Sequence, residues 1–149
     1  MTAKNKQIYQ ANFSEKKLFF NRKKIKYWLN EISEWLFCTQ RKYLDFHYFE
    51  QKEEELNAVL IQLLMAEQFS KEDATSISCD FFFNCVEMHR VLSNDLDAIF
   101  EFDPAAKSKN EVLIAYPGFY AITVHRIANK LWNKNARIVA RLMSEYAHS

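Results

Sequence analysis

The residues that break regular structure are confined to one stretch of the chain. Both prolines, Pro104 and Pro117, and the only glycine, Gly118, lie between Phe100 and Tyr120. Proline and glycine are the strongest local breakers, and tight β-turns depend on glycine. A chain of 149 residues with one glycine cannot make the many tight turns of a β-rich architecture. The sequence therefore predicts an all-α fold in which an irregular elbow joins two helical parts.

Apolar residues outside the elbow recur at helical spacing. Ile25, Trp28, Leu29 and Ile32 stand at i, i+3, i+4 and i+7, on one face of a predicted helix that ends near Thr39. The same criterion predicts further helices at residues 45–69, 70–99, 105–115, 118–134 and 136–148. We thus expect about six helices around an aromatic-rich core.

The ends of these helices follow local signals. Ser70, followed by two acids, predicts a helix start. Asp103-Pro104 is a good N-cap and first-turn pair, and Tyr116-Pro117-Gly118 predicts a second break.

Glu53-Glu54-Glu55 marks part of the solvated face of its helix. The expected domain organisation is a polar N-terminal tail at residues 1–13 and a single helical domain at residues 14–149.

Three consecutive phenylalanines indicate that one helix is covered on more than one side. Phe81, Phe82 and Phe83 cannot all point toward one neighbouring helix, because successive helical residues lie on different faces. Exposed apolar patches of more than a few hundred Å² usually mark interfaces. We therefore expect this helix to be buried on several sides or to lie in a subunit interface.

Charge gives no reason to expect nucleic acid or a membrane as partner. The formal net charge is +1. The segment after Ser14 is basic, and Glu15 is its only acidic residue. Its basic residues are Lys16, Lys17, Arg22, Lys23, Lys24 and Lys26. It could be a patch for nucleic acid or acidic lipid, or the solvated face of a helix. We favour the solvated face, because no RNA-binding or helix-turn-helix signature accompanies it.

Cysteine usage and hydropathy indicate a cytoplasmic protein. Cys38, Cys79 and Cys85 are odd in number and lack C-x-x-C spacing, which favours reduced thiols over a disulfide frame or a zinc site. Residues 1–13 lack the apolar centre of a signal peptide. No apolar run approaches the roughly 20 residues that span a bilayer.

One spacing used by metal sites occurs a single time. Glu145 and His148 form Glu-x-x-His, which di-metal helix bundles use in two copies, with further glutamates from facing helices. No second copy is present in the sequence, nor is a glycine-rich phosphate loop. We expect no metal site in this chain and no cofactor bound by it.

The elbow and the residues after it resemble a known family. The residues concerned are Asp103-Pro104-Ala105-Ala106, Glu111-Val112, Tyr116-Pro117-Gly118-Phe119-Tyr120-Ala121-Ile122, His125-Arg126-Ile127-Ala128, Leu131 and the string from Ala140 to Ser149. Together they resemble the end of the N-terminal helical domain of serine O-acetyltransferases. The similarity is dense from about Asp95 to Ser149, and over residues 1–90 it lies more in helical pattern than in identity.

The resemblance supplies candidate site residues. In serine acetyltransferases the aspartate of the Asp-Pro-Ala motif contacts the bound serine, which implies that Asp103 binds the substrate. From the residues alone Asp103 is most simply a helix cap, and both roles can hold together. The resemblance also offers His125 and Arg126 as part of the active-site wall. From the residues alone, these two are a surface pair that packs against a neighbouring helix.

The resemblance implies a parent enzyme. A serine O-acetyltransferase transfers an acetyl group from its co-substrate, acetyl-CoA, to L-serine in cysteine biosynthesis. Its catalytic base and acetyl-CoA cleft lie in a C-terminal left-handed β-helix of hexapeptide repeats, and no such repeat occurs here. We therefore expect no catalytic residue in this chain, no activity from it alone, and a role in forming a homo-oligomer.

The alternative is a free-standing helical oligomerisation or adaptor module without catalysis. Hexapeptide repeats encoded after Ser149 would favour the enzyme, and a stop codon would favour the module.

Overall fold

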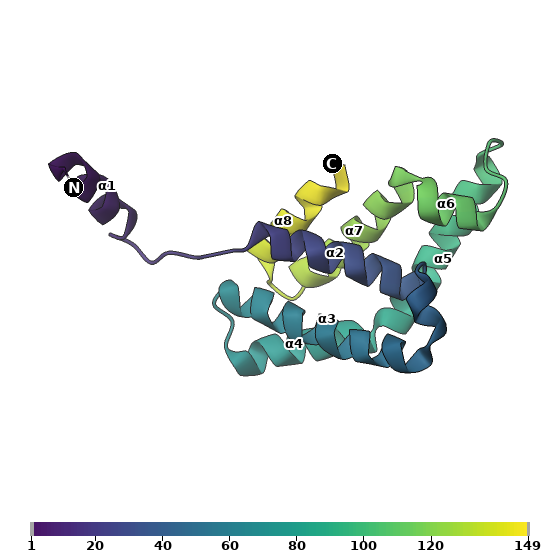
Figure 1. Cartoon of the computed structure of the whole chain (residues 1–149), viewed down its shortest axis with the longest axis horizontal. Coiled ribbons are helices and arrows are strands. Elements are labelled where there is room, and N and C mark those ends of the chain that lie inside the picture. Colours follow the sequence, from purple (N-terminus) through teal and green to yellow (C-terminus); the bar gives the residue numbers. More distant parts are fainter. Residues whose placement is uncertain (1, 149) are drawn as a thin grey trace.

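The fold is all-α, as predicted (Figure 1). The structure is a computed structural model that describes residues 2–148, except for the side chain of His148. Within that range it has eight α-helices, two short 3-10 helices and no strand. The α-helices are α1 (Ala3–Asn12), α2 (Arg22–Phe37), α3 (Phe46–Ala66), α4 (Lys71–Phe83), α5 (Cys85–Phe102), α6 (Lys109–Ala115), α7 (Pro117–Trp132) and α8 (Arg137–Glu145). The 3-10 helices are η1 (Arg41–Leu44) and η2 (Tyr146–His148).

The predicted number of about six helices is too low. One additional helix, α1, lies near the N-terminus, where the hydroxyl of Thr2 accepts the N–H of Asn5 at 3.3 Å. The other arises because the helix predicted at residues 70–99 is divided at Asn84 into α4 and α5. The Asn84 side-chain amide donates to the carbonyl of Asp80 at 2.8 Å. This side-chain bond competes with the regular backbone pattern and allows α5 to leave in a new direction.

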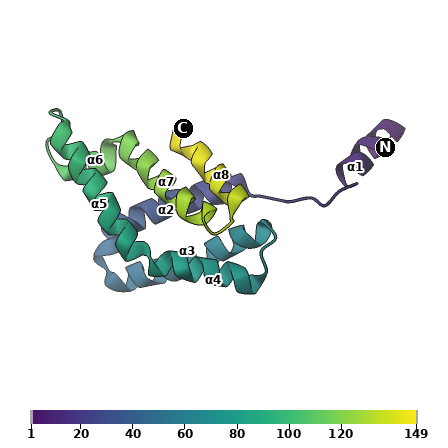
Figure 2. The same ribbon diagram turned by 180° about the vertical axis from the view of Figure 1, so that it is seen from behind.

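Helix α2 lies between two pairs of helices. Figures 1 and 2 show the α3–α4 hairpin on one side of α2 and the α7–α8 pair on the other. The predicted apolar face of α2 is buried, and two tryptophans on it are bonded to α3. The indole N–H of Trp28 donates to the Leu56 carbonyl at 2.9 Å, and that of Trp35 donates to the Phe49 carbonyl at 3.0 Å. Both buried donors are thereby satisfied.

Helix α8 is capped from a distance. Its own N-cap residue, Ala136, has no side chain able to accept a hydrogen bond. The carboxylate of Glu67, just after α3, accepts the backbone N–H of Val139 at 2.8 Å instead. A carboxylate at a helix N-terminus is favoured by the free N–H groups and by the helix dipole. This contact anchors the last helix to the α3–α4 hairpin.

The N-terminal arm extends away from the bundle (Figure 1). None of the residues of α1 is buried, and the segment between α1 and α2 is exposed until Phe20. Neither α1 nor any other helix of residues 2–148 is long and apolar enough to cross a membrane.

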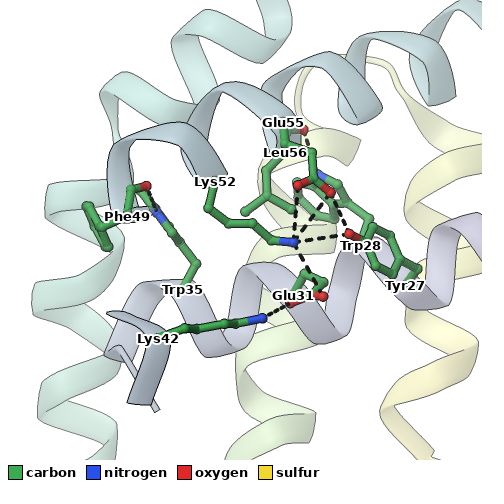
Figure 3. A network of polar contacts seen from close by, with 9 residues as sticks. All are labelled: Tyr27, Trp28, Glu31, Trp35, Lys42, Phe49, Lys52, Glu55 and Leu56. Carbon is green, nitrogen blue, oxygen red and sulfur yellow. Dashed lines mark hydrogen bonds and ion pairs between the residues drawn. The ribbon is translucent and has the colours of Figure 1, made fainter. Parts of the chain in front are cut away.

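A buried lysine joins α2 to α3 (Figure 3). The ammonium group of Lys52, on α3, is 5% exposed and lies 3.1 Å from the hydroxyl of Tyr27, 3.4 Å from a carboxylate oxygen of Glu31 and 3.3 Å from one of Glu55. Burial alone would lower the pKa of Lys52. The hydrogen bond with Tyr27 and the charges of Glu31 and Glu55 outweigh burial and hold this pKa above its ordinary value. The lysine is therefore charged in the folded protein at neutral pH.

The Glu31 carboxylate in this network is incompletely satisfied. Its Oε2 atom is buried without a hydrogen-bond partner, and the ammonium of Lys42, in η1, lies 3.9 Å from it. One helical turn further along α2, burial and the charge of Glu31 raise the pKa of Glu34. Glu31 therefore depends on Lys52 for most of its compensation.

Candidate functional site

Asp103 terminates α5. Its backbone is extended, with φ −110° and ψ 104°, as expected for a residue before proline. Its N–H still donates to the Ile99 carbonyl at 3.1 Å, which completes the last turn of the helix. Its Oδ1 atom accepts the N–H of Ala105 at 2.9 Å and so closes a tight turn around Pro104. The carboxylate is thus fixed at the bend by its own backbone.

The helix after the elbow begins later than predicted. We expected residue 105 as its start, with Asp103-Pro104 as the cap, whereas α6 begins at Lys109. The hydroxyl of Ser108 accepts the N–H of Glu111 at 3.1 Å, and the Glu111 carboxylate accepts the N–H of Lys107 at 2.9 Å. This reciprocal capping is typical of a Ser-x-x-Glu helix start. It places the N-terminus at Ser108, so Asp103 caps a turn rather than a helix.

Tyr116 faces Asp103 across the elbow. It is the N-cap residue of α7, with Pro117 in the first helical position, so the predicted break at Tyr116-Pro117-Gly118 is confirmed. Partial burial, a hydrogen bond to the Asp103 carboxylate and the charges of Asp103 and Glu111 raise the pKa of Tyr116. The phenol of Tyr116 therefore lies close to the Asp103 carboxylate.

A groove of about 460 Å³ lies next to this pair, between the end of α2 and the α6–α7 junction. Tyr116 lines it together with Tyr120, Phe37 and Glu34. The hydroxyl of Tyr120 donates to the side-chain oxygen of Asn30 at 2.8 Å, which ties α7 to α2. Tyr116 thus lies close to Asp103 and also lines a groove with aromatic walls.

His125 and Arg126 lie on α7 but contact different neighbours. Arg126 forms a two-pronged ion pair with Asp95 of α5, with Nε–Oδ2 at 2.6 Å and Nη2–Oδ1 at 2.9 Å. This hydrogen bonding raises the pKa of Arg126. Asp95 precedes Asp103 by eight residues, which is about 12 Å along a helix. His125 lines a different groove, between α7 and α8. The structure therefore commits Arg126 to Asp95 and places His125 at the groove between α7 and α8.

The structure shows two polar features that sequence reasoning missed. Tyr116 was read only as part of a break, although its place before Pro117 could have suggested that it lies opposite the Asp-Pro turn. Lys52 gave no signal, because it precedes Glu53-Glu54-Glu55, which mark the solvated face of the helix.

No metal centre is apparent in the part of the chain that the structure describes. Among those residues, no three His, Cys, Asp or Glu side chains gather to hold an ion. Of the Glu-x-x-His pair, Glu145 pairs with Arg22 at 3.8 Å, and the His148 side chain lies outside the description. The chemistry that the described site can offer is therefore that of the Asp103 carboxylate, which is held by a backbone N–H and lies close to a phenol.

The family model described as "Serine acetyltransferase, N-terminal" matches residues 47–124. The matched range covers 78 of 149 residues and includes the whole elbow. It also begins well upstream of the segment in which the resemblance is dense.

Named relatives agree with this match. The chain is 43% identical over 63 residues to "Serine acetyltransferase, plasmid" of Synechococcus elongatus, covering 42% of this chain and 20% of that protein. It is 45% identical over 56 residues to a serine acetyltransferase of Bacillus subtilis, covering 38% of this chain and 26% of that protein. The similarity therefore spans only a minor part of the length of these relatives.

Solved structures share the fold. The crystal structure of serine acetyltransferase isoform 3 of Entamoeba histolytica in complex with cysteine superposes with a TM-score of 0.75 at 21% identity, over 96% of this chain and 54% of that one. Serine acetyltransferase 1 of the same organism, in complex with L-cysteine, gives a TM-score of 0.74 at 22% identity, over 95% of this chain and 55% of that one. At this identity the likeness concerns the fold alone.

Proposed function

The chain belongs to the family of serine acetyltransferase N-terminal domains, and from this premise we propose that it is the helical part of a serine O-acetyltransferase. The reaction would convert acetyl-CoA and L-serine into O-acetyl-L-serine and CoA, in cysteine biosynthesis in the cytoplasm. The observation that carries the proposal is the family match over residues 47–124. The sequence identity of 43–45% to serine acetyltransferases supports it.

In this proposal Asp103 binds the ammonium group of L-serine. A carboxylate and an ammonium group form a charge-assisted hydrogen bond, which is strong and directional. The carboxylate is pre-oriented by the N–H of Ala105, 2.9 Å from Oδ1, and the phenol of Tyr116 lies close to it. A group that is already held in place loses little conformational entropy when the substrate arrives. The geometry of the turn is thus suited to recognition of a small cation.

We keep His125 and Arg126 as the proposed wall of the site, with Arg126 facing α5 and His125 facing the groove between α7 and α8, and we propose neither as a ligand of serine. Arg126 would act through its ion pair with Asp95, which holds α7 against the helix that ends at Asp103. We assign no catalytic base and no acetyl-CoA contact to these 149 residues. A base outside them would remove the proton of the serine hydroxyl during its attack on the thioester.

The proposal is tested by assaying the protein encoded by the complete gene. We expect serine-dependent release of CoA from acetyl-CoA, detected with a thiol reagent, and no release above a no-protein blank from the 149-residue chain alone. Absence of CoA release from the complete protein would remove the enzyme assignment. CoA release by the 149-residue chain would show that catalytic groups lie within it.

We further propose that the helical domain assembles copies of the protein. The aromatic triplet divides between core and surface: Phe81 is 5% exposed, the ring of Phe82 lies edge-on to Trp35 at 6.0 Å, and Phe83 is 84% exposed. Val86, three residues later at the start of α5, is 82% exposed. Two neighbouring apolar side chains that point into water support an interface at the α4–α5 junction.

Self-association of the chain should therefore depend on this junction. At about 100 μM, light scattering should give a mass above that of a monomer, since association is driven by concentration. Replacing Phe83 and Val86 together by serine should shift the mass toward the monomer. Replacing Phe102 and Ile114, which are 82% and 74% exposed beside the elbow, is the matched control and should have less effect. A monomeric parent chain would contradict the proposal.

A further inference from the structure

The groove between α7 and α8 has the features of a ligand site, and its assignment does not rest on the proposed function. Its volume is about 560 Å³, within the range of roughly 300–1,000 Å³ that is typical of sites for small molecules. Small apolar side chains from both helices line it, together with polar side chains: His125 and Asn129 from α7, and Arg141, Ser144 and Glu145 from α8.

Two arginines beside the groove are braced on one tryptophan. The guanidinium carbons of Arg137 and Arg141 lie 5.2 and 5.6 Å from the centre of the Trp132 ring. The negative face of an indole attracts cations, so the ring holds both side chains in place. Immobilised guanidinium groups bind oxyanions at a smaller entropic cost than free ones. The stack therefore presents the Arg141 guanidinium at the groove and holds that of Arg137, one helical turn earlier on α8, against the same ring.

The two guanidinium groups are only partly compensated within the described part of the protein, because the one carboxylate on α8, that of Glu145, lies a turn beyond Arg141. No carboxylate there forms an ion pair with Arg137 or Arg141, whereas most other ion pairs of this chain join neighbouring helices. Like charges spaced at i and i+4 on a helix repel each other, and Arg137 also lies in the first turn of α8, where a cation opposes the helix dipole. A bound anion would relieve both effects.

We infer that this groove binds the phosphate group of a small phosphomonoester. Such a phosphate carries a charge of about −1.5 to −2 near pH 7, which matches two guanidinium groups. The planar fork of arginine fits phosphate oxygens in a two-pronged manner. Asn129 and Ser144 can add neutral hydrogen bonds from the two sides of the groove. The remaining volume accommodates an organic group.

One acidic side chain at the groove defines the expected position of the phosphate. Glu145 lines the groove one turn beyond Arg141, and its carboxylate lies 3.8 Å from Arg22 of α2. It would repel an anion placed at its end of the groove. The phosphate is therefore expected nearer to Arg141 and Trp132, and removal of the Glu145 charge should strengthen binding.

The test is calorimetric titration of the 149-residue chain with AMP, inorganic phosphate and adenosine. We expect AMP to bind, inorganic phosphate to compete with it, and adenosine to bind at least tenfold more weakly. Because a hydrogen bond to a charged group is strong, Arg141→Gln should weaken AMP binding roughly ten- to hundredfold. Arg90→Gln removes an exposed arginine that pairs with Glu87 on α5, and it should leave binding unchanged. Glu145→Gln should tighten it.

Three outcomes would overturn the inference. The first is the absence of Arg141-dependent binding of both AMP and phosphate at concentrations up to about 10 mM, which corresponds to a very weak complex. The second is an equal loss of affinity in Arg90→Gln, which would indicate non-specific attraction to positive charge. The third is binding to vesicles containing phosphatidic acid but not to AMP, which would assign the groove to a lipid phosphate. Thermal unfolding of each variant confirms that it is folded.

Discussion

Asp103→Asn in the complete protein should lower kcat/KM for serine roughly ten- to hundredfold, because a charge-assisted hydrogen bond contributes about 1.5–3 kcal/mol. Asparagine retains the oxygen that accepts the N–H of Ala105 at 2.9 Å. The turn should therefore survive, and the free energy of unfolding should change by less than about 1 kcal/mol. The KM for acetyl-CoA should remain the same. Steady-state kinetics and thermal unfolding of the same preparation provide all three values.

Two further variants separate recognition from turn formation at Asp103. Asp103→Ala removes both the charge and the oxygen that closes the turn, so it should lose stability as well as activity. Asp97→Asn makes the same chemical change on the exposed surface of α5, where Asp97 pairs with Lys109 at 2.7 Å, and it should leave serine kinetics unchanged. If a well-folded Asp103→Asn enzyme kept normal kcat/KM for serine, Asp103 would be only a turn residue.

The helices that could be predicted from the sequence are those with local signals. The apolar face of α2 is buried at Ile25, Trp28 and Leu29, as its spacing indicated. The hydroxyl of Ser70 accepts the N–H of Asp73 at 3.1 Å and starts α4, as its capping pattern indicated. The break before Pro117 follows from proline geometry. In each case the information lies within a few residues of the feature.

The features that were wrongly predicted depend on competition between signals. Asp103-Pro104 and Ser108 with Glu111 are both reasonable helix starts, and only the second is used, because Asp103 has to complete α5. Asn84 lies within an unbroken apolar stripe, so the periodicity predicted one helix where its side chain divides two. Periodicity alone does not reveal such divisions.

The candidate site could be predicted only in part. Asp103 followed from the resemblance of its motif, whereas its contact with Tyr116 depends on how the elbow folds back on itself. The ion pair between Arg126 and Asp95 joins residues 31 positions apart. Long-range pairs of this kind leave no trace in local spacing, which is why His125 and Arg126 were treated as one pair although they face different helices.

The buried lysine gives the largest expected effect on stability. Lys52→Met keeps most of the length of the side chain but leaves Glu31, whose side chain is 17% exposed, with only Lys42 at 3.9 Å. Removal of one partner from a buried ion pair costs about 3–5 kcal/mol, and the partial exposure of Glu31 reduces this to roughly 2–4 kcal/mol. For a chain of this size we expect the Tm to fall by about 5–15 °C. Lys42→Met is the matched control: its ammonium is 39% exposed, and it should cost less than about 1 kcal/mol.

A second substitution shows whether the loss in Lys52→Met comes from the stranded carboxylate. Adding Glu31→Gln should restore most of the stability, because a neutral amide costs far less to bury than an uncompensated charge. The pKa of Lys52 is raised in the folded state, so its contribution is fully present below the ordinary lysine pKa of about 10.4 and is lost only as pH rises beyond it. The Lys52→Met penalty should therefore be constant between about pH 6 and pH 9. If chemical unfolding gave the same free energy of unfolding for Lys52→Met as for the parent chain, the charged network around Lys52 would make no net contribution to stability.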